Sequence, residues 1–189
     1  WLCTIDNSLL GGVVATDVVR YFVVAQDTLG NLGATPSGGF TGTDVNTVIT
    51  PPTTPNQYTI VTAFTGSFNI GTGETYTSLT NTGGIFEAIN AGALTGNVIL
   101  NITTDLLTET GTVALNQWAE DGVGGYTLTI KPSGAPRQIV GTNTGALVRF
   151  SGTDRVTIDG STTGGTATGV GGNAALRELT IQNTNTGTA

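Results

Sequence analysis

Hydrophobic and polar positions alternate in four short runs in the second half of the chain. The runs are "LNIT" at 100–103, "LTIK" at 128–131, "VTID" at 156–159 and "LTIQ" at 179–182, and their isoleucines are 28, 28 and 23 residues apart. Such alternation points the aliphatic residue and the isoleucine to one face of a strand and the polar residue between them to the other. A unit repeated at this spacing is typical of a solenoid. With the shorter apolar pieces between the runs, the pattern predicts two or three strands per coil of a right-handed parallel β-helix.

One stretch has helical periodicity instead. In "GGIFEAINAG", residues 83–92, Ile85 and Ile89 are four positions apart and Phe86 lies beside them, which makes one apolar face. Gly92 is of the residue type that commonly ends helices. Because a β-helix exposes its core at each end, we expect this helix to be a short N-terminal cap.

The N-terminal quarter of the chain has another pattern. In "DVVRYFVVAQD", residues 17–27, both alternating faces are largely apolar, as expected for a central strand of a sandwich. Turn residues follow in "DTLGNLG". A Tyr early in a long strand, followed by a hairpin, resembles the end of an immunoglobulin-like or fibronectin-like sandwich. We therefore predict that residues 1–47 are the C-terminal strands of such a sandwich, with its first strands upstream.

Three prolines lie among threonines in residues 48–58, "VITPPTTPNQY". This composition favours an extended, semi-rigid linker, although proline-rich peptide ligands are similar. The predicted organisation is then a linker at 48–58 and, at 59–189, the cap and first coils of the β-helix.

Composition and charge narrow the classes of function. The 189 residues carry a net charge of −7, with six Lys and Arg together and no His. Nucleic acids and anionic lipids need a basic face, so neither is an expected partner. The commonest general base and metal ligand is missing, which argues against an enzyme and leaves no cofactor predicted. No run of 18 apolar residues is present, so we expect no direct membrane insertion.

Several phrases together carry a resemblance. "YFVVAQDTLGN" with the Pro/Thr segment, "GGIFEAINAGALTGNVILNIT", "LNQWAEDGVGGYTLTIKPSG" and "RVTIDGSTTGG" are similar to large repetitive cell-surface adhesin-like proteins of gliding bacteria of the Bacteroidota type. The resemblance implies export by a type IX secretion system and an extracellular or cell-surface location. It also implies surface glycans, other adhesin or secretion components, or further modules of the same long chain as partners. The segment begins and ends in mid-pattern, so we expect it to belong to something longer.

Asp159 is the first candidate for chemistry, because some β-helix enzymes cleave polysaccharide with grouped carboxylates. In the repeat register it aligns with Thr103, Lys131 and Gln182, so no second acid stands in that column. Asp-Gly is also a strong turn former. We interpret Asp159 as a turn residue with a charge pair to Lys131, with a metal ligand or a catalytic acid as the alternatives.

Other acids and one aromatic residue are weaker candidates. The pairs Glu120 with Asp121 and Asp27 with Asn31 could bind a structural calcium ion, but neither matches a known calcium loop. Solvated turns are the simpler interpretation. Trp118 either covers a coil junction or serves as a platform for stacking sugars.

The hydroxyl and amide candidates remain. The polar residues in the middle of the four runs are predicted to form an outward column, with Asn101 in the first run followed by Thr129, Thr157 and Thr180. Ice-binding proteins use longer threonine arrays of this kind. Asn101 also begins a sequon, inside a predicted strand. "DTL" at 27–29 resembles the Asp-Ser/Thr-aliphatic motif for O-glycosylation in this bacterial group, which makes Thr28 a candidate site.

The expected function is a structural and adhesive segment of a long extracellular protein, working as a stiff stalk or filament module. Binding would use the outer face of the coils or loops such as 161–172. The alternatives are a polysaccharide-degrading lyase or hydrolase with catalytic coils beyond residue 189, and a carbohydrate-binding module without catalysis.

Overall fold

The computed structural model describes residues 4–163 and 177–187, and the chain divides into two units, residues 1–61 and 62–189. The first unit begins with the 3-10 helix η1 (Asn7–Leu10) and continues with strands only. Its strands are β1 (Val18–Tyr21), β2 (Val23–Gln26), β3 (Leu32–Thr35), β4 (Thr41–Asp44), β5 (Thr47–Thr50) and β6 (Asn56–Thr59).

These strands form three antiparallel pairs, β1 with β6, β2 with β3, and β4 with β5. The hairpin β2–β3 turns at Asp27, as the turn residues predict. Val19 and Pro52 are the two buried residues among the described positions of this unit. Backbone hydrogen bonds between paired strands, rather than a hydrophobic core, therefore define the structure of this unit.

The proline-rich segment differs from the expected linker. Its ends lie in β5 and β6, which pair with β4 and β1. The prolines fall between these two strands, where they remove no hydrogen bond from a ladder. The segment 48–58 is thus part of the antiparallel unit.

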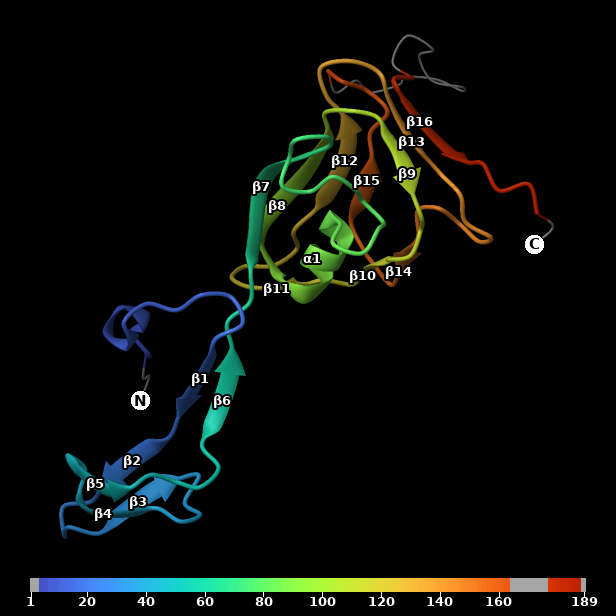
Figure 1. Ribbon diagram of the computed structural model, residues 1–189. Helices are drawn as coiled ribbons and strands as arrows, with labels where there is room; N and C mark the ends of the chain where they lie inside the picture. The colour runs from blue at the N-terminus through green and yellow to red at the C-terminus, as the bar shows by residue number, and fades with distance from the viewer. Residues whose placement is uncertain (1–3, 164–176, 188–189) are drawn as a thin grey trace. The chain divides into compact units, whose positions relative to one another are not determined.

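The second unit is a parallel β-solenoid with one short helix, which confirms the predicted fold class (Figure 1). Its elements are β7 (Ala63–Ile70), α1 (Ile85–Ala91), β8 (Ala93–Ile102), β9 (Leu106–Glu109), β10 (Leu115–Asn116), β11 (Ala119–Glu120), β12 (Leu128–Pro132), β13 (Arg137–Gly141), β14 (Phe150–Ser151), β15 (Val156–Ile158) and β16 (Leu179–Asn183).

Three parallel sheets make the walls of the solenoid. The first is β7–β8–β12–β15, with β11 also on β8, the second β9–β13–β16 and the third β10–β14. Inward positions of β12 alternate with outward ones, so that Leu128, Ile130 and Pro132 are buried. The predicted cap is confirmed, because Ile85, Phe86 and Ile89 of α1 are fully buried in the same core. Figure 1 shows α1 between the three sheets.

The register corrects the predicted columns at two places. Ile130 pairs with Leu100, two residues earlier than the predicted Ile102. The fourth run lies in β16, which pairs with β13 in the second sheet, so Ile181 stacks on Ile139. The first error keeps the inward and outward faces correct, because a shift of two residues leaves alternation unchanged. The second error concerns the choice of sheet, and Ile181 still stacks on an inward residue, the buried Ile139.

Candidate functional site: a polar corner between two coils

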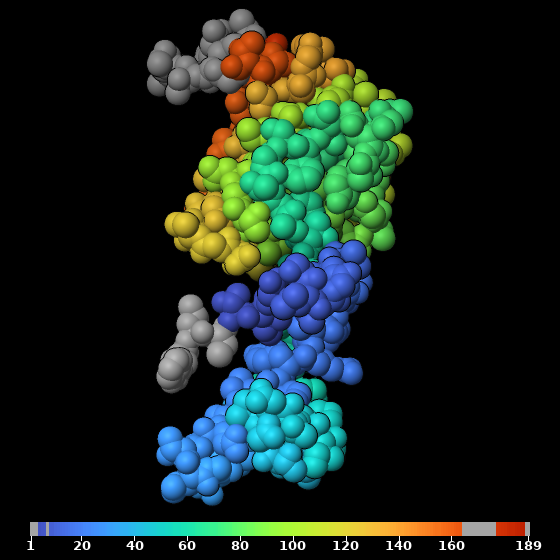
Figure 2. Space-filling view, turned by 90° about the vertical axis from the view of Figure 1, so that its left-hand side faces the viewer, coloured from blue at the N-terminus to red at the C-terminus, as the bar shows by residue number. Residues whose placement is uncertain are grey.

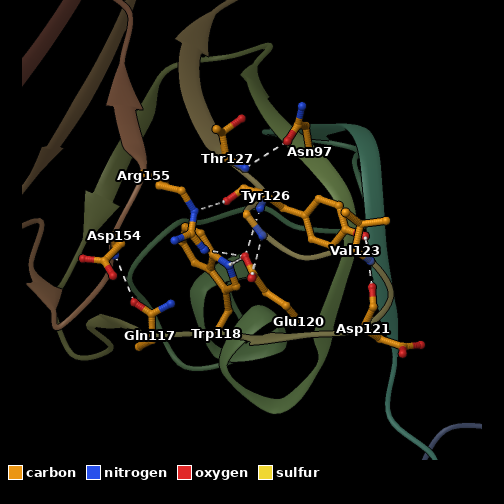
Figure 3. A network of polar contacts seen from close by, with 11 residues as sticks. Asn97, Gln117, Trp118, Glu120, Asp121, Val123, Tyr126, Thr127, Asp154 and Arg155 are labelled. Atoms are coloured by element: carbon orange, nitrogen blue, oxygen red, sulfur yellow. Dashed lines mark hydrogen bonds and ion pairs between the residues drawn. The ribbon is translucent and has the colours of Figure 1, made fainter.

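A network of polar contacts lies where β11 turns toward β12. The loop between these strands, residues 121–127, protrudes from the side of the solenoid, in yellow in Figure 2. Its backbone has positive φ at Gly124 (76°) and Gly125 (75°), a conformation that other residue types rarely adopt. The turn brings the N–H groups of Gly125 and Tyr126 back toward Glu120 (Figure 3).

The Glu120 carboxylate accepts four hydrogen bonds. Its Oε1 receives the Trp118 indole N–H at 3.1 Å, the Tyr126 N–H at 3.0 Å and the Arg155 guanidinium at 2.5 Å. Its Oε2 receives the Gly125 N–H at 2.9 Å. The donors come from its own loop and from the next coil, so Glu120 ties together two layers of the solenoid.

These donors favour the charged carboxylate. The Gly125 N–H has the largest effect and the Trp118 indole the next, while Arg155 and the Tyr126 N–H add to them. Against the opposing effect of desolvation, they lower the pKa of Glu120 from its usual 4.5 to about 2.

Arg155 completes the corner from the third coil. Its backbone has a φ of 56°, and its Nε donates to the Tyr126 carbonyl at 2.9 Å. Gln117 adds a parallel link, since its Oε1 accepts the Asp154 N–H at 3.0 Å. Sequence reasoning missed Arg155. The sequence did hold a signal for this pair. Arg155 directly precedes a predicted strand, and Glu120, two residues after Trp118, lies about one repeat earlier in the chain.

The chemistry of this corner is that of a clamp. Catalysis or calcium binding needs carboxylate lone pairs that can reach a ligand, and those of Glu120 already face protein donors. Trp118 is only 4% exposed, so it covers the coil junction and offers no face for a sugar. Among the described residues, no group of three or more His, Cys, Asp or Glu is placed to hold a metal ion.

Asp159 takes the turn role that its sequence predicts. Its Oδ1 accepts the Ser161 N–H at 2.9 Å, and its own N–H donates to the Ile130 carbonyl at 2.9 Å. It lies next to Lys131 in the ladder, but these two described residues form no ion pair within 4 Å. The expected charge pair is therefore wrong.

The threonine column is shorter than predicted. Thr129 pairs with Thr157, but Ile99 precedes them on β8, and Thr180 pairs with Gln138 in another sheet. Asn101 lies beside Lys131. A flat threonine array is absent from the described strands, which removes the basis for ice binding.

Asp27 and Asn31, the calcium candidates of the first unit, hydrogen-bond to each other within the β2–β3 turn. The Asp27 carboxylate accepts the Leu29 N–H at 2.9 Å, the Asn31 N–H at 2.8 Å and the Asn31 side-chain amide at 2.7 Å. The Asn31 amide is the main reason that the pKa of Asp27 is lowered. Thr28 lies exposed at the tip of this turn.

A second engaged carboxylate, Glu109, was not predicted. It is 2% exposed and accepts the N–H groups of Leu79 (3.0 Å) and Thr80 (2.7 Å) as well as the Thr80 hydroxyl. The alternation of polar and apolar residues does not predict that Glu109 is buried. The register of β9 against β13 shifts between Ile139 and Gly141, and Glu109 lies after this shift. Glu109 joins the loop before α1 to the first coil.

The loop at 161–172, expected to be a binding surface, lies outside the described residues from 164 onward. None of the described helices is long and apolar enough to span a membrane. Comparison of the chain with models of known families, with curated proteins and with solved structures finds no significant match.

Proposed function

We propose that the chain is a structural and adhesive segment of an extracellular surface protein, a stiff stalk or filament module that presents binding surfaces. The observation that carries the proposal is that side-chain hydrogen bonds, as well as paired strands, connect neighbouring layers of the solenoid. In six places among the described residues, a side-chain oxygen of one layer accepts a backbone N–H of the next. The pairs are Thr80 with Gly111 (3.0 Å), Asn81 with Thr110 (2.7 Å), Asn90 with Asn116 (2.9 Å), Asn97 with Thr127 (2.9 Å), Asp105 with Gln138 (3.0 Å) and Gln117 with Asp154 (3.0 Å).

These links suit a load-bearing role. Strand ladders alone leave the corners of each coil free to open, and corner hydrogen bonds satisfy backbone groups that would otherwise face water. The coils would then unfold under force as a set rather than one by one. The polar groups of the described corners serve the backbone, which supports a structural role over catalysis.

A stretching experiment tests the stalk role. The chain, held by its ends in an optical trap or atomic force microscope, is expected to give one cooperative unfolding event for the solenoid. Asn97→Ala together with Gln117→Ala should lower the unfolding force, and Thr157→Ala, on the outer face, is the matched control. Extension at low force without a distinct event would contradict the proposal.

A sugar assay addresses the enzymatic alternative. Incubation with a panel of plant, algal and bacterial polysaccharides is expected to release neither reducing nor unsaturated ends. Release that is lost in Asp159→Asn but kept in Asp154→Asn would instead support a lyase or hydrolase.

A second candidate, glycan binding without catalysis, is favoured by one hollow. An open depression of about 370 Å³ lies along the edge of β7, lined by Ser67, Phe68, Asn69, Glu74, Thr75 and Tyr76. Phe68 and Tyr76 are half-buried, and aromatic rings beside amide, hydroxyl and carboxylate groups suit the mixed surface of a sugar. The binding surface of the stalk would then be its first coil.

A glycan array tests this hollow. Binding of a neutral or basic glycan should be lost in Tyr76→Ala and weakened in Glu74→Gln, and kept in Val123→Ala on a remote loop. Binding that survives Tyr76→Ala would place the glycan elsewhere.

Thr28 belongs to the same extracellular proposal as a candidate O-glycosylation site. Its hydroxyl is exposed at a turn held by Asp27, which leaves it open to a transferase. Intact-mass measurement on protein from the native host should show hexose increments that vanish in Thr28→Val and persist in Thr41→Val. An unmodified native mass would remove this site.

A further inference from the structure

A row of polar side chains begins in the hollow beside β7 and crosses the outer face of the first sheet. Asn69 of β7, which lines the hollow, pairs with Asn101 of β8, and Asn101 pairs with Lys131 of β12. Each of the three alternates with buried or half-buried residues along its strand, so its side chain points outward. Two amides and one ammonium group therefore extend the hollow across three neighbouring strands.

The groups of this row are open to a ligand. Lys131 forms no ion pair and no hydrogen bond with its side chain in the described parts of the chain. The carboxylate of Asp159, its neighbour in the ladder, accepts the Ser161 N–H instead. The two amides contact each other only at 3.5 Å, between the Asn101 nitrogen and the Asn69 oxygen. Most of the hydrogen-bonding capacity of the row is thus left for another molecule.

Such a row fits an extended glycan better than a protein surface. A protein partner needs apolar side chains at the centre of its contact, whereas the row presents amide and ammonium groups. Neighbouring strands are about 5 Å apart, which is close to the advance per residue of an extended β-linked sugar chain. Successive sugars that start in the hollow would therefore meet Asn69, Asn101 and Lys131 in turn.

The two ends of the row differ in charge. The hollow contains the half-buried Glu74, whose carboxylate favours neutral or basic sugars and repels acidic ones. The far end has the unpaired ammonium of Lys131, which forms its strongest hydrogen bonds with anionic groups. Asp159 lies beyond Lys131 in the ladder, so its charge disfavours a further acidic sugar and ends the row.

We propose that the hollow and this row together bind a glycan chain in which an acidic sugar, bearing a carboxylate or a sulfate, stands about two residues from the neutral or basic sugar in the hollow. The acidic group binds Lys131, and hydroxyls of the sugar between bind Asn101. This site rests on the glycan-binding role proposed for the hollow, and it adds to that role the acidic sugar and the path of the chain.

Matched pairs of glycans test the acidic end. The probes are short oligosaccharides of glucose, glucosamine or N-acetylglucosamine that carry one terminal glucuronic acid, each compared with its carboxyl-reduced form. In an array read over a concentration series, the acidic member of a pair is expected to bind about tenfold more tightly, because reduction removes the charge-assisted hydrogen bond. Lys131→Gln should abolish this preference and keep binding of the reduced member, which also shows that the variant folds. Lys131→Glu should reverse the preference.

Arg20→Gln is the matched control, because it removes the same charge from an exposed position of β1 in the first unit and should leave the preference unchanged. Tyr76→Ala should abolish binding of both members, since it removes the hollow. Equal binding of both members, or a preference that survives Lys131→Gln, would overturn the acidic end and leave the glycan role of the hollow intact. No binding of either member to the native chain would overturn both.

Discussion

Glu120 is the residue whose protonation has the most predictable consequence. Its folded pKa is about 2 and its usual value is 4.5, so the folded state binds fewer protons than the unfolded state between these values. The stability that Glu120 contributes is complete above about pH 4.5 and is lost as the pH falls through about 2.

The Glu120→Gln variant checks this linkage. Denaturant unfolding should show the variant less stable than the native chain at neutral pH, with the difference shrinking below pH 4.5. Asp121→Asn is the control, since the hydrogen bonds of Asp121 among the described residues are made by its backbone N–H and carbonyl. A difference that stays constant down to pH 2 would mean that the carboxylate charge plays no part.

Glu109 gives a second prediction at this scale. Glu109→Ala leaves the buried N–H groups of Leu79 and Thr80 without acceptors, so the free energy of unfolding should fall by at least about 2 kcal/mol. Chemical denaturation at neutral pH measures it, with Asp154→Ala as a surface control. Equal stability of the two variants would show that water or a neighbour replaces the carboxylate.

At the scale of elements, α1 is expected to hold the first coil closed. Ile89 is fully buried in the common core, and Ile89→Ala should lower the free energy of unfolding by about 2–5 kcal/mol. Val123→Ala should change it by less than about 0.5 kcal/mol. Thermal unfolding followed by circular dichroism compares the two, and similar midpoints would mean that the cap is dispensable.

The elements also show how far the sequence could predict the fold. The spacing of Ile85 and Ile89 predicts α1, and the alternation around Ile130 predicts β12, because both patterns report directly which face is buried. The pairing of Ile130 with Leu100 was not predictable, since Leu100 and Ile102 both point inward and are chemically alike. Nothing local assigns Ile181 to the second sheet either, because all three walls alternate in the same way.

The candidate site was predictable only in part. Asp159 before Gly160 predicts its own turn, and Trp118 beside Glu120 marks a junction. The link from Glu120 to Arg155 spans 35 residues, so it depends on how the coils stack. The proline-rich segment was misread for a similar reason, since β6 at its C-terminal end pairs with β1, which lies far away along the chain.

At the scale of the whole molecule, the proposals that concern the solenoid depend on the coils stacking in the observed register. Ile99, Thr129 and Thr157 form one outward column, whereas the repeat pattern alone would set Asn101 beside Thr129. Neighbouring strands are about 5 Å apart, and a two-residue offset increases the separation to about 8 Å. The two registers therefore predict different distances from Thr129 to Ile99 and to Asn101, which spin labels at these positions can distinguish.

Paired nitroxide labels measure this most directly. In a Cys3→Ser background, labels on Ile99→Cys with Thr129→Cys and on Thr129→Cys with Thr157→Cys should give spectra broadened by strong spin exchange. Labels on Asn101→Cys with Thr129→Cys should give clearly weaker exchange. Strong exchange in the Asn101 pair with weak exchange in the Ile99 pair would contradict the register, and weak exchange in all three would contradict the stacked solenoid itself.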